Sequence, residues 1–211
     1  MIEKILFGIP SKGRLKEDTI KMLRDAGFEI KEQKRKYLAE SNSSWLKFIF
    51  LRAADIPVFV KYGALDMGIT GHDFVVERGN DITELLDLKY GRADLCLGVS
   101  ETSNYKSIED LPNNIRVGTE FPRITTSYFD TLGINAEVIE LRGSVEITIA
   151  LKLTDAIVDL VSTGKTFREN GLVVIDKIME TTARLIVNPI TFRTKEPFIE
   201  KIRENIAEVI K

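Results

Sequence analysis

The sequence predicts an α/β protein built as two lobes, because of its size, the order of its elements and the lack of a linker. The chain has 211 residues, enough for one large domain or two small lobes. Short apolar runs alternate with amphipathic stretches, which indicates strands and helices in mixed, mostly parallel sheets. No segment rich in Pro, Gly or Ser interrupts this alternation. Two lobes joined by crossing strands therefore fit better than two tethered domains.

The first series of elements opens with the apolar run 5–9, which predicts a strand. Apolar positions at near-helical spacing over 15–26 predict a helix, with Ser11 as its N-cap and Gly27 as its stop. The same alternation of strand and helix then continues. Strands are expected at 45–51, 66–70 and 82–88, and helices at 55–63 and 72–78.

A second series begins near Asp94 and has the same character. Strands are expected at 95–99, 116–118, 136–141 and 156–161, and helices at 122–132, 144–151 and from 164 to about 170. The tail 197–211 places six apolar side chains on one helical stripe, which we expect to pack against the first lobe. We assign 1–91 and 178–211 to the first lobe and 92–177 to the second.

Composition and charge exclude several classes of protein. Thirty Lys and Arg against 32 Asp and Glu give a net charge of −2 without a basic cluster, so no nucleic-acid partner is expected. The single Cys96 cannot form an internal disulfide or a thiolate metal site. The apolar run at the start is too short for a signal peptide or a membrane span, so we expect a cytoplasmic protein without a membrane partner. His72 is the only histidine, which excludes histidine-rich metal sites.

The segment 155–166, DAIVDLVSTGKT, carries the clearest chemical signal. A buried strand leads into a loop of small hydroxyl residues and Gly that opens a helix. Free N–H groups at a helix N-terminus bind anions, so this loop predicts a phosphate cradle. The alternative is that two of these hydroxyl residues only cap the helix. The cradle residues are Ser162, Thr163, Gly164, Lys165 and Thr166.

Two carboxylates in the same segment suggest which phosphate is bound. A Walker A loop requires Gly five residues before Gly164, where this chain has Asp159, so a P-loop NTPase is disfavoured. A carboxylate there would repel a triphosphate but can accept hydrogen bonds from sugar hydroxyls. Asp155 and Asp159 beside the cradle therefore favour a ribose 5-phosphate.

The longer segment 140–172, ELRGSVEITIALKLTDAIVDLVSTGKTFRENGL, resembles the ATP phosphoribosyltransferases, the first enzymes of histidine biosynthesis. PSKGRL at 10–15, RAADIP at 52–57 and DMGITGHD at 66–73 are similar to other signatures of that family, in the same order. The resemblance implies that N1 of the ATP adenine joins C1 of phosphoribosyl pyrophosphate (PRPP), with Mg²⁺ present and pyrophosphate released. It also implies a two-lobed fold like that of periplasmic binding proteins, with the active site in the cleft between the lobes.

Compared with the long members of the family, which continue into a histidine-sensing domain, this chain ends near Lys211 and resembles the short form. That resemblance implies a separate regulatory subunit similar to histidyl-tRNA synthetase, and a homo-oligomer, such as a dimer, or a hetero-oligomer. Phe167 stands where the family usually has Leu, and Lys165 occupies a variable position, so Lys165 is not an essential phosphate ligand.

The family match and the chemistry of the leaving group suggest roles for further residues. Departing pyrophosphate requires cations, and Lys12 and Arg14 follow the first strand, although they can also be solvated loop charges. Arg52 follows another strand, where it can bind ATP or pair with Asp55.

The remaining candidates lie at expected helix starts. Glu146 is a candidate for binding a ribose hydroxyl or Mg²⁺. The alternative is that it is only an exposed acid in the first turn of the helix, favoured by the helix dipole. Gly143 and Ser144 open the same helix and are expected to contact ATP. Asp73 can accept a hydrogen bond from the adenine amino group, or it can be structural. Adenine N1 is itself the nucleophile, so no enzymatic base is required.

One other function suits the same expected fold. A cytoplasmic module that binds or senses a phosphorylated solute would also have two lobes and a phosphate cradle, since fold alone does not determine function.

Overall fold

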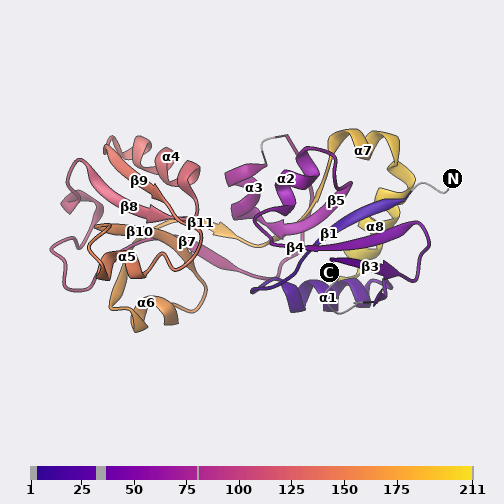
Figure 1. Ribbon diagram of the computed structural model, residues 1–211, viewed down its shortest axis with the longest axis horizontal. Coiled ribbons are helices and arrows are strands. Elements are labelled where there is room, and N and C mark those ends of the chain that lie inside the picture. The colour runs from indigo at the N-terminus through magenta and orange to yellow at the C-terminus, as the bar shows by residue number, and fades with distance from the viewer. Residues whose placement is uncertain (1–3, 32–36, 80, 211) are drawn as a thin grey trace. The chain divides into compact units, whose positions relative to one another are not determined.

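The computed structural model describes residues 4–31, 37–79 and 81–210, and they form two compact units (Figure 1). Unit 1 contains Met1–Gly91 and Thr182–Lys211, and unit 2 contains Arg92–Thr181. The return to unit 1 falls at Thr182 rather than at the expected residue 178. The reason is that β11 (Leu172–Thr181) is one strand that pairs along its length with β7 (Ala93–Ser100).

Unit 1 is built on one seven-stranded mixed sheet. Its three central strands are parallel, and the edges are antiparallel. In sheet order the strands are β2 (Ile30–Lys31), β3 (Leu38–Ser41), β4 (Leu46–Leu51), β1 (Ile5–Pro10), β5 (Met67–Gly71), β12 (Ala183–Val187) and β6 (Thr83–Asp87).

Helices cover both faces of this sheet. On one face, α1 (Lys16–Asp25) and α8 (Glu196–Val209) pack on a core that includes Phe7 and Phe48. On the other, α2 (Ile56–Lys61) and α3 (His72–Arg78) pack on the intervening side chains, such as Leu6. A short helix, α7 (Pro189–Thr194), precedes α8. The expected stripe of the tail helix is confirmed, since Ile199, Ile202 and Ile206 are fully buried.

Unit 2 has a five-stranded mixed sheet in the order β11, β7, β10 (Ala156–Val161), β8 (Ile115–Thr119) and β9 (Ala136–Glu140). Figure 1 shows α4 (Pro122–Leu132) on one face of this sheet and α5 (Ile147–Ala150) and α6 (Lys165–Glu169) on the other. A 3₁₀ turn at Ile108–Asp110 precedes β8.

Several details differ from the expectation. Among the described residues only four of ten strand pairings are parallel, because β3, β7 and β12 run against their neighbours. The expected Ser11 cap is wrong: α1 begins at Lys16, and Leu15 occupies the N-cap position without a capping side chain. The helix expected at 144–151 is reduced to α5. In the described part of the chain, no helix is long and apolar enough to cross a bilayer.

Candidate active site

Three loops of unit 2 lie at the same edge of its sheet. Strands β10, β8 and β9 are parallel neighbours, so their carboxyl ends lie together. Loops 162–164, 120–121 and 141–146 follow these ends. The amino end of β7 and the carboxyl end of β11 lie at this edge as well, because Asp94 pairs with Val161 and Thr181 with Ala93. Ligands of open α/β sheets bind outside the carboxyl ends of the strands, which makes this edge the candidate site in unit 2.

The loop after β10 has the features of an anion cradle. Ser162, Thr163, Lys165 and Thr166 are exposed and available to a ligand. Gly164 has a φ of 69°, and a Cβ there would lie 2.8 Å from the Arg168 guanidinium. The left-handed turn therefore favours glycine. Arg168 holds the loop by donating a hydrogen bond to the Thr163 carbonyl at 3.1 Å, and the Thr163 hydroxyl accepts one from the Lys165 amide at 3.4 Å.

Asp159 lies on β10 just before this loop, on the side of the sheet that carries α5 and α6. The pKa of Asp159 is raised to about 6, mainly by burial and also by the charges of Glu146 and Glu120, against a lowering hydrogen bond from the Leu160 amide. Three carboxylates thus gather at one edge. Like charges that lie close together disfavour each other's ionisation, so the group favours a ligand that donates hydrogen bonds or carries positive charge.

Asp155 does not join this group. It precedes β10, at the opposite end of a six-residue strand, about 20 Å from the cradle at roughly 3.3 Å per residue. Its carboxylate accepts hydrogen bonds from the Arg116 guanidinium at 2.8 and 3.0 Å and from the Arg116 amide at 3.1 Å. These bonds lower the pKa of Asp155. The structure therefore gives Asp155 a role in joining β8 to β10 rather than a place beside the phosphate loop.

The loop before α5 brings Glu146 to the same edge as Asp159. Gly143 and Ser144 are exposed, with φ values of 115° and 49°, so the backbone makes a left-handed turn here. Thr148 fixes the turn from below, donating a hydrogen bond to the Val145 carbonyl at 2.6 Å. Gly143 and Ser144 thus lie in an exposed loop rather than in the first turn of a helix.

Glu120 is a residue that the sequence analysis missed. It follows β8, whose Thr119 pairs with Val158 of β10, so Glu120 comes beside Asp159. The buried Thr119 hydroxyl accepts a hydrogen bond from the Phe121 amide at 2.9 Å and donates one to the Val158 carbonyl at 2.8 Å, which fixes this loop. The signal was available, because Glu120 lies two residues after the strand expected at 116–118.

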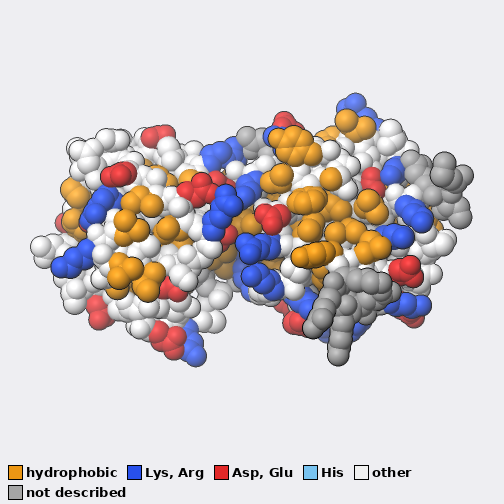
Figure 2. Space-filling view, in the orientation of Figure 1, with side chains coloured by type: hydrophobic (Ala, Val, Ile, Leu, Met, Phe, Trp, Pro, Cys, Tyr) orange, Lys and Arg blue, Asp and Glu red, His pale blue; other side chains and the backbone are white. Residues whose placement is uncertain are grey.

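Unit 1 has a corresponding edge with the opposite charge. Strands β1, β4 and β5 are parallel and end together, and they lead to Lys12 and Arg14, to Arg52 and to Asp73, respectively. Lys12 and Arg52 are exposed, and in the described residues no ion pair joins Arg52 to Asp55. Figure 2 shows blue side chains along the margin of unit 1 at which β1 and β4 end in Figure 1.

Arg14 and Asp73, both candidate site residues, contact each other. The Arg14 guanidinium lies 3.6 Å from the fully buried Asp73 carboxylate and donates a hydrogen bond to the Gly91 carbonyl. Burial lowers the pKa of Arg14, and Asp73 opposes that effect. The Asp73 side chain does not face solvent, whereas the Arg14 side chain remains 27% exposed.

The described residues contain no set of three or more His, Cys, Asp or Glu side chains placed to hold a metal ion. Mg²⁺ commonly binds through one or two carboxylates together with substrate phosphates. Asp159 and Glu146 fit that arrangement, in which the cation arrives with the substrate.

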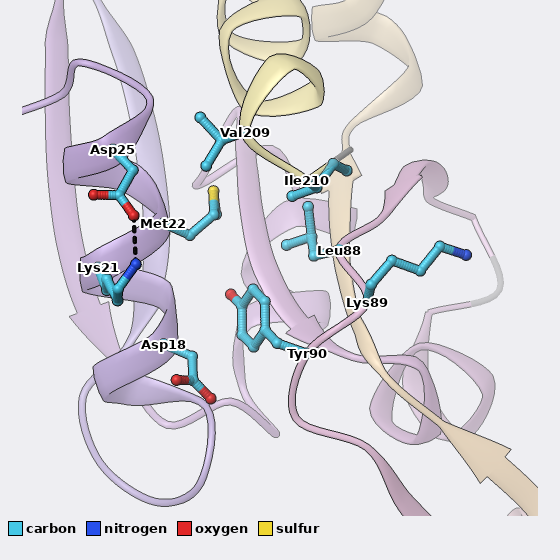
Figure 3. Close-up of a pocket in the computed structure, with 9 residues that line it drawn as sticks. All are labelled: Asp18, Lys21, Met22, Asp25, Leu88, Lys89, Tyr90, Val209 and Ile210. Carbon is cyan, nitrogen blue, oxygen red and sulfur yellow. Dashed lines mark hydrogen bonds and ion pairs between the residues drawn. The ribbon is translucent and has the colours of Figure 1, made fainter.

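Unit 1 also has a cavity of about 350 Å³ between α1, the end of α8 and residues 88–90 (Figure 3). Met22, Leu88 and Ile210 form apolar parts of its wall, and Lys21 pairs with Asp25 at its rim. No predicted site residue lines it, so it is separate from the candidate site.

Comparison with known proteins agrees with the resemblance. A family model described as HisG, ATP phosphoribosyltransferase, matches residues 52–208. The ATP phosphoribosyltransferase of Methanothermobacter thermautotrophicus is 47% identical over 208 residues, which cover 98% of this chain and 72% of that protein. A chain of the ATP phosphoribosyl transferase (HisG:HisZ) complex from Thermotoga maritima has a TM-score of 0.84 and 28% identity, with 98% of both chains covered.

A more distant likeness concerns the fold alone. The arginine-bound form of ArgBP from T. maritima has a TM-score of 0.60 at 15% identity, covering 98% of this chain and 96% of that one. The expected α/β fold like that of periplasmic binding proteins is thus confirmed, while a solute-binding function is not favoured. The family model and the 47% identical relative show that the chain belongs to the ATP phosphoribosyltransferase family.

Proposed function

We propose that the chain joins N1 of the ATP adenine to C1 of PRPP and releases pyrophosphate, the first step of histidine biosynthesis. The observation that carries the assignment of the site is the edge of unit 2, where an exposed phosphate loop lies beside three carboxylates. The 5-phosphate of PRPP binds Ser162, Thr163 and Thr166, and Asp159 and Glu146 accept hydrogen bonds from the ribose hydroxyls.

The two edges supply opposite charges to the reaction. As the bond from C1 to the pyrophosphate oxygen breaks, the electron pair leaves with pyrophosphate and positive charge develops on the ribose. Glu120, Glu146 and Asp159 stabilise that charge in unit 2, while Lys12, Arg14 and Arg52 of unit 1 stabilise the leaving group and the phosphates of ATP. The adenine N1 lone pair then forms the new bond to C1.

Mg²⁺ would neutralise charge on the pyrophosphate, with Asp159 and Glu146 as its protein ligands. The residues themselves orient the ribose between the phosphate loop and the acidic side chains.

The direct test incubates the purified chain with ATP, PRPP and Mg²⁺ and follows phosphoribosyl-ATP and pyrophosphate. Equal amounts of the two products are expected. Release of pyrophosphate from PRPP without any phosphoribosyl-ATP would contradict the proposal. Binding of both substrates without turnover would also contradict it and would favour a phosphorylated-solute sensor.

We further propose that a separate regulatory subunit related to HisZ provides histidine control in the cytoplasm. The support is the T. maritima chain, which is covered to 98% by this one and comes from a HisG:HisZ complex. Isolated protein should then be almost insensitive to histidine while AMP still competes for the ATP site. Tight, saturable histidine binding that AMP does not displace would contradict this.

A further inference from the structure

The Arg14 guanidinium is held on two sides within unit 1. Its Nη1 donates a hydrogen bond to the Gly91 carbonyl, and its Nη2 lies 3.6 Å from the Asp73 carboxylate. The loop that carries Arg14 follows β1, and Asp73 is the second residue of α3, which follows β5. Strands β1 and β5 are parallel neighbours, so the segments that follow them meet at one edge of the sheet. Segments far apart in the sequence thus hold one cation.

The Asp73 carboxylate occupies a space that the backbone leaves for it. Its side chain has no exposed surface, which is rare for an aspartate that lacks a charged partner. A Cβ at Gly71 would lie 2.0 Å from the Asp73 Oδ1. The φ of Gly71 is −78°, which any residue can adopt, so the glycine is required for space and not for backbone conformation. Position 71 is therefore fitted to the carboxylate of Asp73.

Gly91 leaves similar room on the other side of the guanidinium. A Cβ there would lie 2.2 Å from the side chain of Leu15 and 3.1 Å from the Arg14 Nη1. Leu15 is buried in the core of unit 1, and the φ of Gly91 is 63°, which also favours glycine. Two glycines and one buried carboxylate thus define the position of the guanidinium.

The two charged groups differ in their access to a ligand. Burial lowers the pKa of Arg14, whereas the charge of Asp73 raises it, so Asp73 compensates for the hydration that Arg14 loses. Leaving either charge without the other would be unfavourable. The Arg14 side chain is 27% exposed and the Asp73 side chain is not exposed at all. Of the pair, only Arg14 can therefore meet a ligand from solvent without a movement of the side chain.

We propose that Asp73 is a positioning residue for Arg14. It does not touch substrate, but it holds the guanidinium in the orientation that binds phosphate oxygens. This role rests on the proposed function, in which Arg14 stabilises the departing pyrophosphate. It replaces the expected contact between Asp73 and the adenine amino group with an indirect effect on the phosphates.

Inorganic pyrophosphate with Mg²⁺ is a suitable probe, because it has phosphates but no adenine. In calorimetric titrations Arg14→Ala should weaken its binding about tenfold, through the loss of a charged hydrogen-bond donor. Asp73→Asn should weaken it about fivefold, because the guanidinium loses its orientation. If Asp73 only accepted a hydrogen bond from the adenine amino group, pyrophosphate binding would not weaken in Asp73→Asn.

The sign of this change separates positioning from simple electrostatics. Asp73→Asn removes a negative charge, and Coulomb's law alone then predicts tighter binding of an anion. Weaker binding therefore reports the lost orientation of Arg14. Tighter or unchanged binding of pyrophosphate by a folded Asp73→Asn would overturn the proposal.

A double-mutant cycle tests whether Asp73 acts through Arg14. In the Arg14→Ala background, the added Asp73→Asn change should alter pyrophosphate affinity less than about twofold, since no guanidinium is left to hold. The cycle measured on kcat should show the same pattern. A similar loss in both backgrounds would show that Asp73 acts independently of Arg14, and would overturn the proposal.

Asp66→Asn is a matched control from the opposite end of β5. The Asp66 side chain is 12% exposed, pairs with Lys195 at 3.1 Å and accepts a hydrogen bond from the Leu6 amide at 2.8 Å. Its replacement should lower thermal stability but leave pyrophosphate affinity within about twofold of wild type. A fivefold loss in this control would mean that any buried aspartate of unit 1 has the effect, which would also overturn the proposal.

Gly71→Ala is a second variant, and it keeps every charge. Its Cβ must displace the Asp73 carboxylate, so pyrophosphate affinity should fall as in Asp73→Asn. If neither variant folds, Asp73 is a requirement of the fold and the proposal is wrong. An inactive wild type that shows the expected pyrophosphate cycle would support the role of Asp73 and would contradict the proposed transferase activity instead.

Discussion

The carboxyl edges of the two sheets are built alike but carry opposite charge. In unit 1, loops after three parallel strands present Lys12, Arg14 and Arg52. In unit 2, loops after three parallel strands present Glu120, Glu146 and the phosphate loop, with Asp159 beside them. One arrangement of strands has thus produced a cationic edge and an acidic one.

The difference shows how the chain can divide a reaction that creates two charges. Anionic leaving groups are stabilised by cations, whereas a developing ribose cation is stabilised by carboxylates. Placing both sets on one edge would pair them with each other, as Arg116 and Asp155 do at the other end of the unit 2 sheet. Each set instead lies at the edge of its own sheet.

The largest effect is expected in the cationic edge. Arg14→Ala should lower kcat about 100-fold, similar to the loss of one donor to a developing anion, with a smaller rise in KM for ATP. Charge on departing pyrophosphate is greatest in the transition state. Steady-state kinetics of the variant test this prediction. A normal kcat with only a raised KM for ATP would show that Arg14 does not stabilise the departing pyrophosphate.

A smaller effect is expected in the phosphate loop of unit 2. Thr163→Ala removes one hydrogen bond to a charged group, worth about 1.5 kcal/mol, so PRPP should bind about tenfold more weakly. Thr131→Ala is the control, because Thr131 is exposed and its hydroxyl donates a hydrogen bond to the Tyr128 carbonyl within α4. If Thr163→Ala and wild type bind PRPP with equal affinity by calorimetry, the assignment of this loop as the phosphate cradle is wrong.

The Asp159 carboxylate at the acidic edge should lower the free energy of unfolding at neutral pH. The pKa of Asp159 is raised from 3.8 to about 6 in the folded protein, so the folded state holds the proton more tightly than the unfolded state. Stability is then lost as pH rises from about 4 through 6. Asp159→Asn should be more stable than wild type by about 3 kcal/mol at pH 7 and similar to it near pH 4.

Denaturant unfolding of both proteins at the two pH values measures this difference. If the variant is less stable than wild type at pH 7, the ionised Asp159 carboxylate stabilises the folded protein. That result would contradict the view that this carboxylate lacks stabilising contacts until a ligand binds.

The smallest effect concerns Asp155, whose pair with Arg116 is partly exposed. Asp155→Asn should destabilise the protein by about 1 kcal/mol or less, because solvent screens the pair. Thermal unfolding would show a shift of a few degrees at most. A severe loss of folding would show that this contact does more than join β8 to β10.

Local patterns predicted most of the fold. The apolar runs that became β1, β4, β5 and β10 and the stripe of α8 are strongly periodic, and periodicity is a local property. The strands β11 and β12 were not expected because residues 172–187 combine polar and apolar positions without clear alternation, and two bulges interrupt the pairing of β11. Pairing with a distant strand determines such a segment, and sequence alone does not show the partner.

The site shows the same limit. The phosphate loop is contiguous, so its hydroxyl residues and Gly164 were predictable. Asp155 and Asp159 are close in sequence, but Asp155 precedes β10 whereas Asp159 lies near the carboxyl end of that strand. The buried pair of Arg14 and Asp73 joins residues 59 positions apart, and no local pattern predicts that contact.

Calorimetric titration of PRPP with Mg²⁺ into wild type, Asp159→Asn and Asp155→Asn at pH 7 tests the central claim most directly, namely that the acidic edge of unit 2 binds the phosphoribosyl group. Asp159→Asn should weaken binding about 10- to 100-fold, since a hydrogen bond to a charged group contributes about 1.5 to 3 kcal/mol. Asp155→Asn should stay within about twofold of wild type. Equal losses in both variants, or a loss in Asp155→Asn alone, would contradict the account.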